Sequence, residues 1–318
     1  MKTTIMARHV TLLLAFCAIQ CVMTTSACAF QNAVIPSEVV HGVAANDDTA
    51  SFAGTWNYGL PNYEKDINIS RISCPKGKTP PDRTLFVPQV GSITMTKTGE
   101  HEMLGTTDQG CGWTFITDGN SAHLDGPQKS CFNKIIQVSY TVTKWDISLT
   151  KGAWDEFMTV DSTSSMGTCE SVKAKGPRSR VIEDSKRDDA KTFVGNWRYE
   201  PTDPVTQKNT ALAACPDSKM PQMLILKGSM SIEQTGPHSI NAINENGCRL
   251  KFAVQGNTAA LNPSVQTCEN APKGSPKTYN FWTMATDGKE LFEFGSALIG
   301  DEHGDCVLRA TQGVRSLQ

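Results

Sequence analysis

The fold class of this chain is most clearly indicated by one stretch, Gly110-Cys-Gly-Trp-Thr-Phe-Ile-Thr-Asp-Gly119-Asn-Ser-Ala-His-Leu124. Apolar and polar residues alternate on both sides of Gly119-Asn120, a dipeptide that suits the tight turn between two antiparallel strands. With those two residues in the turn, Phe115 lies opposite Leu124. The stretch therefore predicts a β-hairpin, with Cys111 and Cys131 near its open end.

The same hairpin occurs a second time, with its turn at Gly256-Asn257. The interval from Cys248 to Cys268 equals the interval from Cys111 to Cys131. A single alignment of the two repeats, interrupted only by one loop of changed length, matches many further positions. The chain is therefore a tandem duplication. Other matched pairs are Trp56 and Trp197, Cys74 and Cys215, Phe115 and Phe252, Trp145 and Trp282, Glu156 and Glu293, and Cys169 and Cys306.

The hydropathy pattern predicts an all-β protein. In residues 91–97, Ile93 and Met95 alternate with serine and threonine, and residues 228–232 repeat this pattern. Such a period of two is typical of a half-buried antiparallel strand. No segment after the N-terminal region has the pattern of an amphipathic helix. Further strands are expected at residues 51–58, 136–145, 154–160 and 167–172, and at 192–199 in the second repeat.

The N-terminus has the features of a secretory signal. Lys2 and Arg8 precede an apolar run at residues 10–23, and Ala27-Cys28-Ala29 offers a cleavage site. The run is shorter than the roughly 20 residues that a membrane helix needs. Secretion, or export to the periplasm, is therefore the expected localisation, and a lipoprotein anchored at Cys28 is the alternative. No transmembrane segment is expected in the chain after this N-terminal region.

Cleavage there leaves eight cysteines, four in each repeat at matched positions. An even number of cysteines in an exported chain indicates disulfides rather than reactive thiols or a metal site. Four cysteines allow three pairings, and the constant spacing favours a nested one. The preferred disulfides are Cys111–Cys131, Cys74–Cys169, Cys248–Cys268 and Cys215–Cys306.

Composition divides the chain between the repeats. Residues 170–190 carry six basic and five acidic residues with little apolar content, and they include Gly176-Pro177. Such a stretch resembles a disordered linker because it cannot bury enough apolar surface. The expected segments are a signal peptide at 1–29, an extended leader at 30–50, a first domain at 51–173, a charged flexible linker at 174–191, a second domain at 192–310 and a tail at 311–318.

Each domain opens with a Gly-x-Trp motif, at Gly54 and Trp56 and again at Gly195 and Trp197. This motif resembles that of the calycin barrels, the lipocalins and avidins, in which the tryptophan packs at the closed end of an eight-stranded barrel. Lipocalins also cover this tryptophan with a basic residue from the last strand. Arg309 resembles that residue in the second domain, and Lys173 is the nearest candidate in the first. The resemblance implies two disulfide-stapled antiparallel β-barrels, and a β-sandwich is the alternative.

The resemblance also implies a cavity for a small apolar or amphiphilic ligand, because an eight-stranded barrel either holds one ligand or is filled by side chains. The candidate ligand-binding residues are aromatic, and the competing interpretation makes them core. The alternative function is accordingly a structural or surface protein for adhesion or envelope architecture, with filled β cores. The candidates are Trp113, Phe115, Trp145, Phe252 and Trp282.

No motif indicates an enzyme or a cofactor. His101 and His238 recur without a matched nucleophile, and Asp155 and Glu156 are neighbours that point to opposite faces of a strand. Glu156 and Glu293 are therefore interpreted as exposed or structural. A formal net charge of −2 gives no basic field for nucleic acid. The sequence does not identify a protein partner.

Overall fold

The computed structural model describes residues 48–318, except 75–83, 127–129, 134–137, 165–166, 183, 185, 204–207, 216–221, 270, 272–275 and 302–303. The expected signal peptide and nearly all of the expected leader fall outside the described residues. The side chain of Arg309 also lies outside the described part of the structure. Within the described part of the chain, no helix combines the length and apolar character that crossing a bilayer requires.

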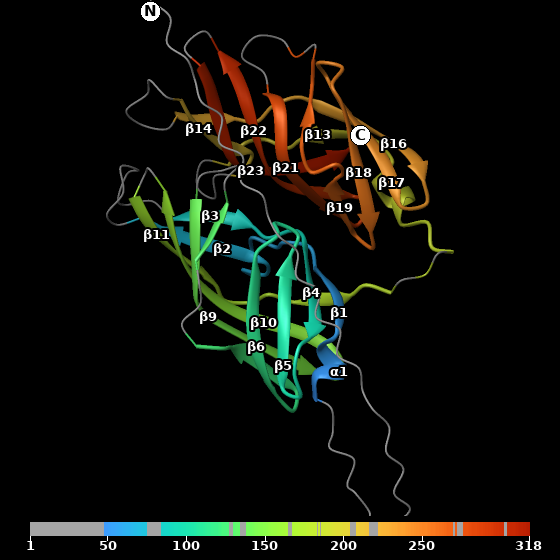
Figure 1. The fold of residues 1–318 in the computed structure, drawn as a ribbon. Coiled ribbons are helices and arrows are strands. Elements are labelled where there is room, and N and C mark those ends of the chain that lie inside the picture. Colours follow the sequence, from blue (N-terminus) through green and yellow to red (C-terminus); the bar gives the residue numbers. More distant parts are fainter. Residues whose placement is uncertain are drawn as a thin grey trace, which may run out of the picture. The chain divides into compact units, whose positions relative to one another are not determined.

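The protein is all-β and forms two closed antiparallel barrels of eight strands, so the barrel prediction is confirmed and the sandwich alternative is wrong (Figure 1). In the first barrel, β1 is hydrogen-bonded to β4 on one side and to β12 on the other, which closes the sheet. The strands in order around this barrel are β1 (Gly54–Tyr58), β4 (Ser92–Lys97), β5 (Glu102–Thr107), β6 (Gly112–Asp118), β7 (Ser121–Leu124), β9 (Val138–Thr150), β10 (Ala153–Ser164) and β12 (Arg178–Arg180).

The sheet of the first barrel extends beyond the closed ring. The far half of β10 pairs with β11 (Gly167–Lys173), which continues to β2 (Ile69–Ser73) and β3 (Leu85–Pro88). β8 (Cys131–Asn133) pairs with β9. This extension lengthens one end of the barrel.

The second barrel repeats this order, and β13 pairs with both β16 and β23 to close it. Its ring comprises β13 (Gly195–Tyr199), β16 (Ser229–Gly236), β17 (Ser239–Asn244), β18 (Arg249–Gln255), β19 (Thr258–Leu261), β21 (Pro276–Thr286), β22 (Glu290–Asp301) and β23 (Gly304–Leu317). The additional strands are β14 (Thr210–Ala214), β15 (Gln222–Ile225) and β20 (Gln266–Thr267).

The central hairpin has the register that its turn predicted. Phe115 pairs with Leu124 across β6 and β7, and Phe252 pairs with Leu261 across β18 and β19. Gly119, at φ 57°, and Gly256, at φ 61°, supply the left-handed conformation that a tight turn needs. The turn chemistry therefore fixed which face of each hairpin points into the core.

A short helical turn precedes the first strand of each barrel, where the sequence predicted an extended leader or a flexible linker that runs directly into a strand. The first is α1 (Asp48–Phe52) and the second is the 3₁₀ helix η1 (Asp189–Phe193). The indole N–H of Trp56 donates to the carbonyl of Phe52 at 2.8 Å, and Trp197 donates to Phe193 at 2.7 Å. Each tryptophan thus uses its polar atom to satisfy the helical turn while its ring lies in the core.

Two of the expected boundaries are wrong because the last strand of each barrel was missed. β12 lies inside the expected linker at 174–191, and β23 runs through the expected tail at 311–318. In the alignment of the repeats, β11 and β12 together correspond to β23. The charges of this segment misled the interpretation, because the basic residue at 178 pairs with a buried acid rather than with solvent.

Candidate functional site

A buried glutamate occupies the same place in each barrel. Glu156 on β10 is 3 % exposed, and Glu293 on β22 is fully buried. Of the two interpretations, exposed or structural, burial excludes the first and fits the second, because neighbouring strands bring cations onto the same face. A bare carboxylate is costly to bury, so its partners determine whether the barrel tolerates it.

Five side-chain donors surround the carboxylate of Glu156. Arg178 on β12 binds both carboxylate oxygens at 3.1 Å, in the fork geometry that arginine offers a carboxylate. Lys173 on β11 donates to Oε1. The indole N–H groups of Trp145 and Trp154 each donate to Oε2 at 3.0 Å.

The protonation of this cluster follows from its partners. Burial alone raises the pKa of the Glu156 carboxyl, but the charges of Arg178 and Lys173 outweigh it and lower the pKa to about 2. Burial lowers the pKa of Lys173 to about 8, against the attraction of Glu156. The glutamate is therefore ionised and saturated with donors, so it is not poised to exchange a proton at neutral pH.

Tyr58 on β1 connects this cluster to the start of the barrel. Lys173 donates to its hydroxyl, and the Arg178 guanidinium lies 3.4 Å from the centre of its ring. In the second barrel, Tyr199 donates directly to Glu293, and Arg315 lies 3.5 Å from the centre of the Tyr199 ring. First strand, last strand and buried glutamate are thus tied together in both barrels.

A glycine makes room for each glutamate. A side chain at Gly176 would overlap the side chain of Glu156, and one at Gly313 would overlap that of Glu293. The chain carries these residues at one spacing, because the intervals from Glu156 to Gly176 and to Arg178 equal those from Glu293 to Gly313 and to Arg315. This repeated spacing was the signal in the sequence that could have revealed the cluster.

Arg309 does not cover Trp197, the tryptophan of the second Gly-x-Trp motif, as the lipocalin resemblance implied. Arg309 pairs with Leu212 and lies eight residues before Leu317, the residue opposite Trp197. Eight strand residues span about 26 Å, so Arg309 is remote from Trp197. In the first barrel, Arg180 on β12 lies 4.8 Å from the centre of the Trp56 ring.

A cavity of about 260 Å³ is lined mainly by residues of the first barrel and of its extension. Aliphatic side chains from β2, β3, β9 and β10 form much of its wall, together with the disulfide Cys74–Cys169. Tyr58 and Arg178 bring the edge of the ionic cluster to the same wall. The apolar lining residues that matter here are Ile72, Val87, Trp113, Val142, Trp145 and Val160.

One polar atom at this cavity has no partner. The indole N–H of Trp113 is buried without a hydrogen bond in the part of the chain that the structure describes, and the residue is 6 % exposed. The ring itself packs against Trp145, with 5.8 Å between ring centres. A buried donor without an acceptor costs about 1–3 kcal/mol, so this N–H is a polar group that the described residues leave unsatisfied beside the cavity.

The other aromatic candidates lie in the cores. Phe115 is fully buried and packs on Trp145 at 5.2 Å between ring centres. Phe252 is also buried, and Trp282 packs against Tyr279 and over Gly295, which leaves no room for a side chain there. Of the five candidates, Trp113 and Trp145 line the cavity of the first barrel.

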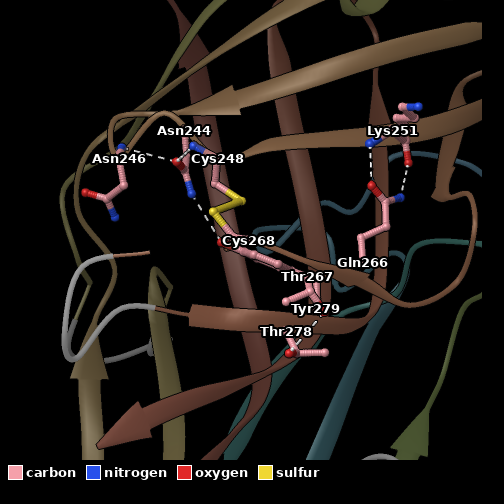
Figure 2. The surroundings of a disulfide bond; sticks show 9 residues. All are labelled: Asn244, Asn246, Cys248, Lys251, Gln266, Thr267, Cys268, Thr278 and Tyr279. Atoms are coloured by element: carbon pink, nitrogen blue, oxygen red, sulfur yellow. Dashed lines mark hydrogen bonds between the residues drawn. A yellow bond between two sulfur atoms is a disulfide. The ribbon is translucent and has the colours of Figure 1, made fainter. Parts of the chain in front are cut away.

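The structure joins the eight cysteines in the nested pattern, as Cys74–Cys169, Cys111–Cys131, Cys215–Cys306 and Cys248–Cys268. Figure 2 shows the last of these, whose Cα atoms are 5.5 Å apart. Asn244 accepts hydrogen bonds from the backbone N–H groups of Asn246 and Cys248, at 3.1 and 2.9 Å, and donates to the hydroxyl of Tyr279 at 3.2 Å. This ordered polar frame marks the disulfide as a structural staple of the hairpin.

Comparison with known proteins does not assign this chain to a family. No protein-family model matches it, and no curated protein matches it. A protein of unknown function from the DUF3598 family of Nostoc punctiforme aligns over 86 % of this chain and 98 % of its own, at 7 % identity and a TM-score of 0.25. A "putative outer membrane protein" of Bacteroides fragilis aligns over 86 % and 100 %, at 9 % identity and a TM-score of 0.23. At these TM-scores neither likeness bears on function.

Proposed function

We propose that this protein is a non-catalytic binding protein, and that its first barrel holds a small, mostly apolar ligand in the manner of a calycin barrel. The observation that carries the proposal is the cavity of about 260 Å³ with an unpaired indole N–H in its wall. Ligand sites in proteins are typically apolar cavities with a few placed polar groups. The four disulfides support a role outside the reducing cytoplasm, as a secreted or periplasmic protein.

The ligand is expected to present a hydrogen-bond acceptor to Trp113. Binding rather than catalysis is supported by the state of the buried acid, because every side chain around Glu156 serves to hold its charge. The alternative, a structural or surface protein with filled cores, predicts an empty and unresponsive first barrel.

Isothermal titration of the full chain with 2-decanone, an apolar chain with one acceptor, tests the proposal. Wild-type protein is expected to bind it, and Trp113→Phe to bind it about 3- to 10-fold more weakly, because the phenyl ring keeps the apolar wall but lacks the donor. Trp282→Phe in the second barrel is the control and should leave the affinity unchanged. Native mass spectrometry of the protein as isolated should also show a bound small molecule.

Absence of binding to the wild type in both experiments would overturn the proposal and support the structural alternative. Equal affinities of wild type and Trp113→Phe for 2-decanone would show that the indole N–H of Trp113 does not contact the ligand.

A further inference from the structure

One edge strand of the second barrel's sheet has no neighbour on its outer side. β15 pairs with β14, and it is the last strand of that sheet in the described part of the chain. The backbone N–H of Leu226 donates to the carbonyl of Asn209 at 2.9 Å, which fixes the phase of the ladder. Because hydrogen-bonded pairs alternate along an antiparallel ladder, the N–H and C=O groups of Met223 and Ile225 point away from β14.

The side chains of the same two residues are apolar and exposed. Met223 is 44 % exposed and Ile225 is 56 % exposed. They lie on one face of the strand, whereas Leu224 between them packs against the core of the second barrel. The described residues offer no partner to the outward backbone groups. An edge with these properties is a template for pairing with another chain.

The corresponding edge of the first barrel is blocked. In the alignment of the repeats, Ile225 matches Pro88 on β3. The N–H of Gln89 donates to the carbonyl of Asn68 at 2.7 Å, so this ladder has the same phase and the nitrogen of Pro88 faces outward. Proline has no N–H, and its presence protects an edge strand from pairing. Pro88 is also buried. The first repeat therefore lacks the donor that the second repeat presents.

We propose that β15 is a dimerisation edge whose partner is β15 of a second copy of this chain, paired antiparallel about a two-fold axis at Leu224. In this register Met223 lies opposite Ile225 of the partner subunit, and the same pair recurs across the axis. Every outward N–H of one strand then meets an outward C=O of the other. The exposed apolar side chains become cross-strand neighbours on one face. The inference does not depend on the ligand of the first barrel.

The chemistry of the edge favours a second copy over an unrelated peptide. The strand, Gln-Met-Leu-Ile, carries no charge, so two copies place no like charges opposite each other. The pairing is isologous, so it uses both outer edges and stops at two molecules. Pairing of β15 with the β3 edge of another copy would instead extend into a fibre, and Pro88 withholds the donor that such a contact needs.

Sedimentation equilibrium of the disulfide-bonded full chain, at roughly 1 to 300 µM because so small an interface is weak, tests the proposal. The wild type is expected to pass from monomer to dimer. Ile225→Pro copies the residue of the first repeat and leaves the bonds to β14 intact. It should raise the Kd of the dimer at least about tenfold, because each copy loses a donor. Val265→Thr, at a residue 48 % exposed outside β14 and β15, is the control and should leave the Kd unchanged.

Hydrogen exchange keeps the test decisive if Ile225→Pro does not fold. In the wild type, the amides of Met223 and Ile225 should exchange several-fold more slowly at the highest concentration than at the lowest. The amide of Phe86, the residue of β3 that matches Met223, should exchange equally at both. Mass spectrometry with fragmentation to single residues measures these rates.

A wild type that stays monomeric at the highest concentration would overturn the proposal, as would a folded Ile225→Pro that dimerises like the wild type. Protection of Met223 and Ile225 already at the lowest concentration would show that another part of the same chain covers the edge, and it would overturn the proposal as well. Dimerisation without added protection at these two amides would place the interface elsewhere.

Discussion

The two barrels treat the same buried glutamate differently. Glu156 is held by two cations and two indoles, whereas Glu293 is held by Arg315 and Tyr199. The arginine, the tyrosine and the glycine beside the acid are common to both copies. What the copies share therefore closes the barrel, because it joins the first and last strands, and what they do not share is the additional cation and the indole donors around Glu156.

The last strand gives a second contrast. β23 is continuous, whereas its counterpart is divided into β11 and β12 around residues 174–177. Val314 donates its backbone N–H to Oδ1 of Asn209 at 2.6 Å. The corresponding residue is Pro177, which has no N–H, and Oδ1 of Asn68 is buried without a partner in the described residues. The interruption in the first barrel thus has a chemical cause.

Replacing the glutamates should have the largest effect on stability and should reveal the largest difference between the two barrels. Glu156→Gln removes the carboxylate that both buried cations contact, and the expected loss in the free energy of unfolding is about 3–5 kcal/mol. Glu293→Gln leaves one cation, so its loss should be smaller. Denaturant unfolding of the full chain, followed by tryptophan fluorescence and circular dichroism, measures both.

Glu100→Gln is the control for this pair, because Glu100 is exposed and a surface change of this kind costs less than about 0.5 kcal/mol. A loss in Glu293→Gln as large as that in Glu156→Gln would contradict the idea that two contacting cations make the buried acid harder to replace than one.

The glycines beside the glutamates should behave alike. Gly176→Ala and Gly313→Ala each force a methyl group into the space of a buried acid side chain, and overpacking of this kind costs about 1–3 kcal/mol. Gly59→Ala, where the new methyl group meets only ordinary contacts at 3.5 Å, is the matched control. Thermal unfolding of the three variants measures the difference. A cost confined to one barrel would show that the shared device is not equivalent in the two.

Exchanging the residues of the last strand should have the smallest effect. Pro177→Val restores an N–H facing Oδ1 of Asn68 and is expected to add about 1 kcal/mol of stability, reduced by the entropy that proline removes from the unfolded chain. Val314→Pro removes the corresponding bond and should destabilise the second barrel. Hydrogen exchange near Asn68 and Asn209, read by mass spectrometry, reports on each site. Destabilisation by Pro177→Val would refute this explanation of the interruption.

Much of the fold was predictable because each informative sequence pattern occurs in both repeats. The turn at Gly119-Asn120 fixed the hairpin register, and the all-β class followed from alternating residues such as Ile93 and Met95. Closure of the barrel was not derivable from these local patterns. It depends on the pairing of β1 with β12, two strands at opposite ends of the repeat, and it entered only through the resemblance of the Gly-x-Trp motif.

The candidate site was harder to predict. Aromatic type alone does not distinguish Trp113, which lines the cavity, from Phe115, which lies in the core two residues later on the same strand. Glu156 and Arg178 look like surface charges because a sequence does not show burial. The same residues recur at the same spacing as Glu293 and Arg315, with a glycine between them. This repeated spacing could have indicated the cluster, but the interpretation relied on the cysteines and aromatic residues instead.

The position of β12 also matters to anyone who expresses the first repeat separately. A clone that ends at Lys173 contains every cysteine of that repeat. It lacks β12, the strand that completes the barrel between β1 and β10. Those two exposed borders are templates for pairing with other molecules, so such a product is expected to aggregate. Extending the coding region past Arg180 restores the seal, and with it the arginine that neutralises the buried acid.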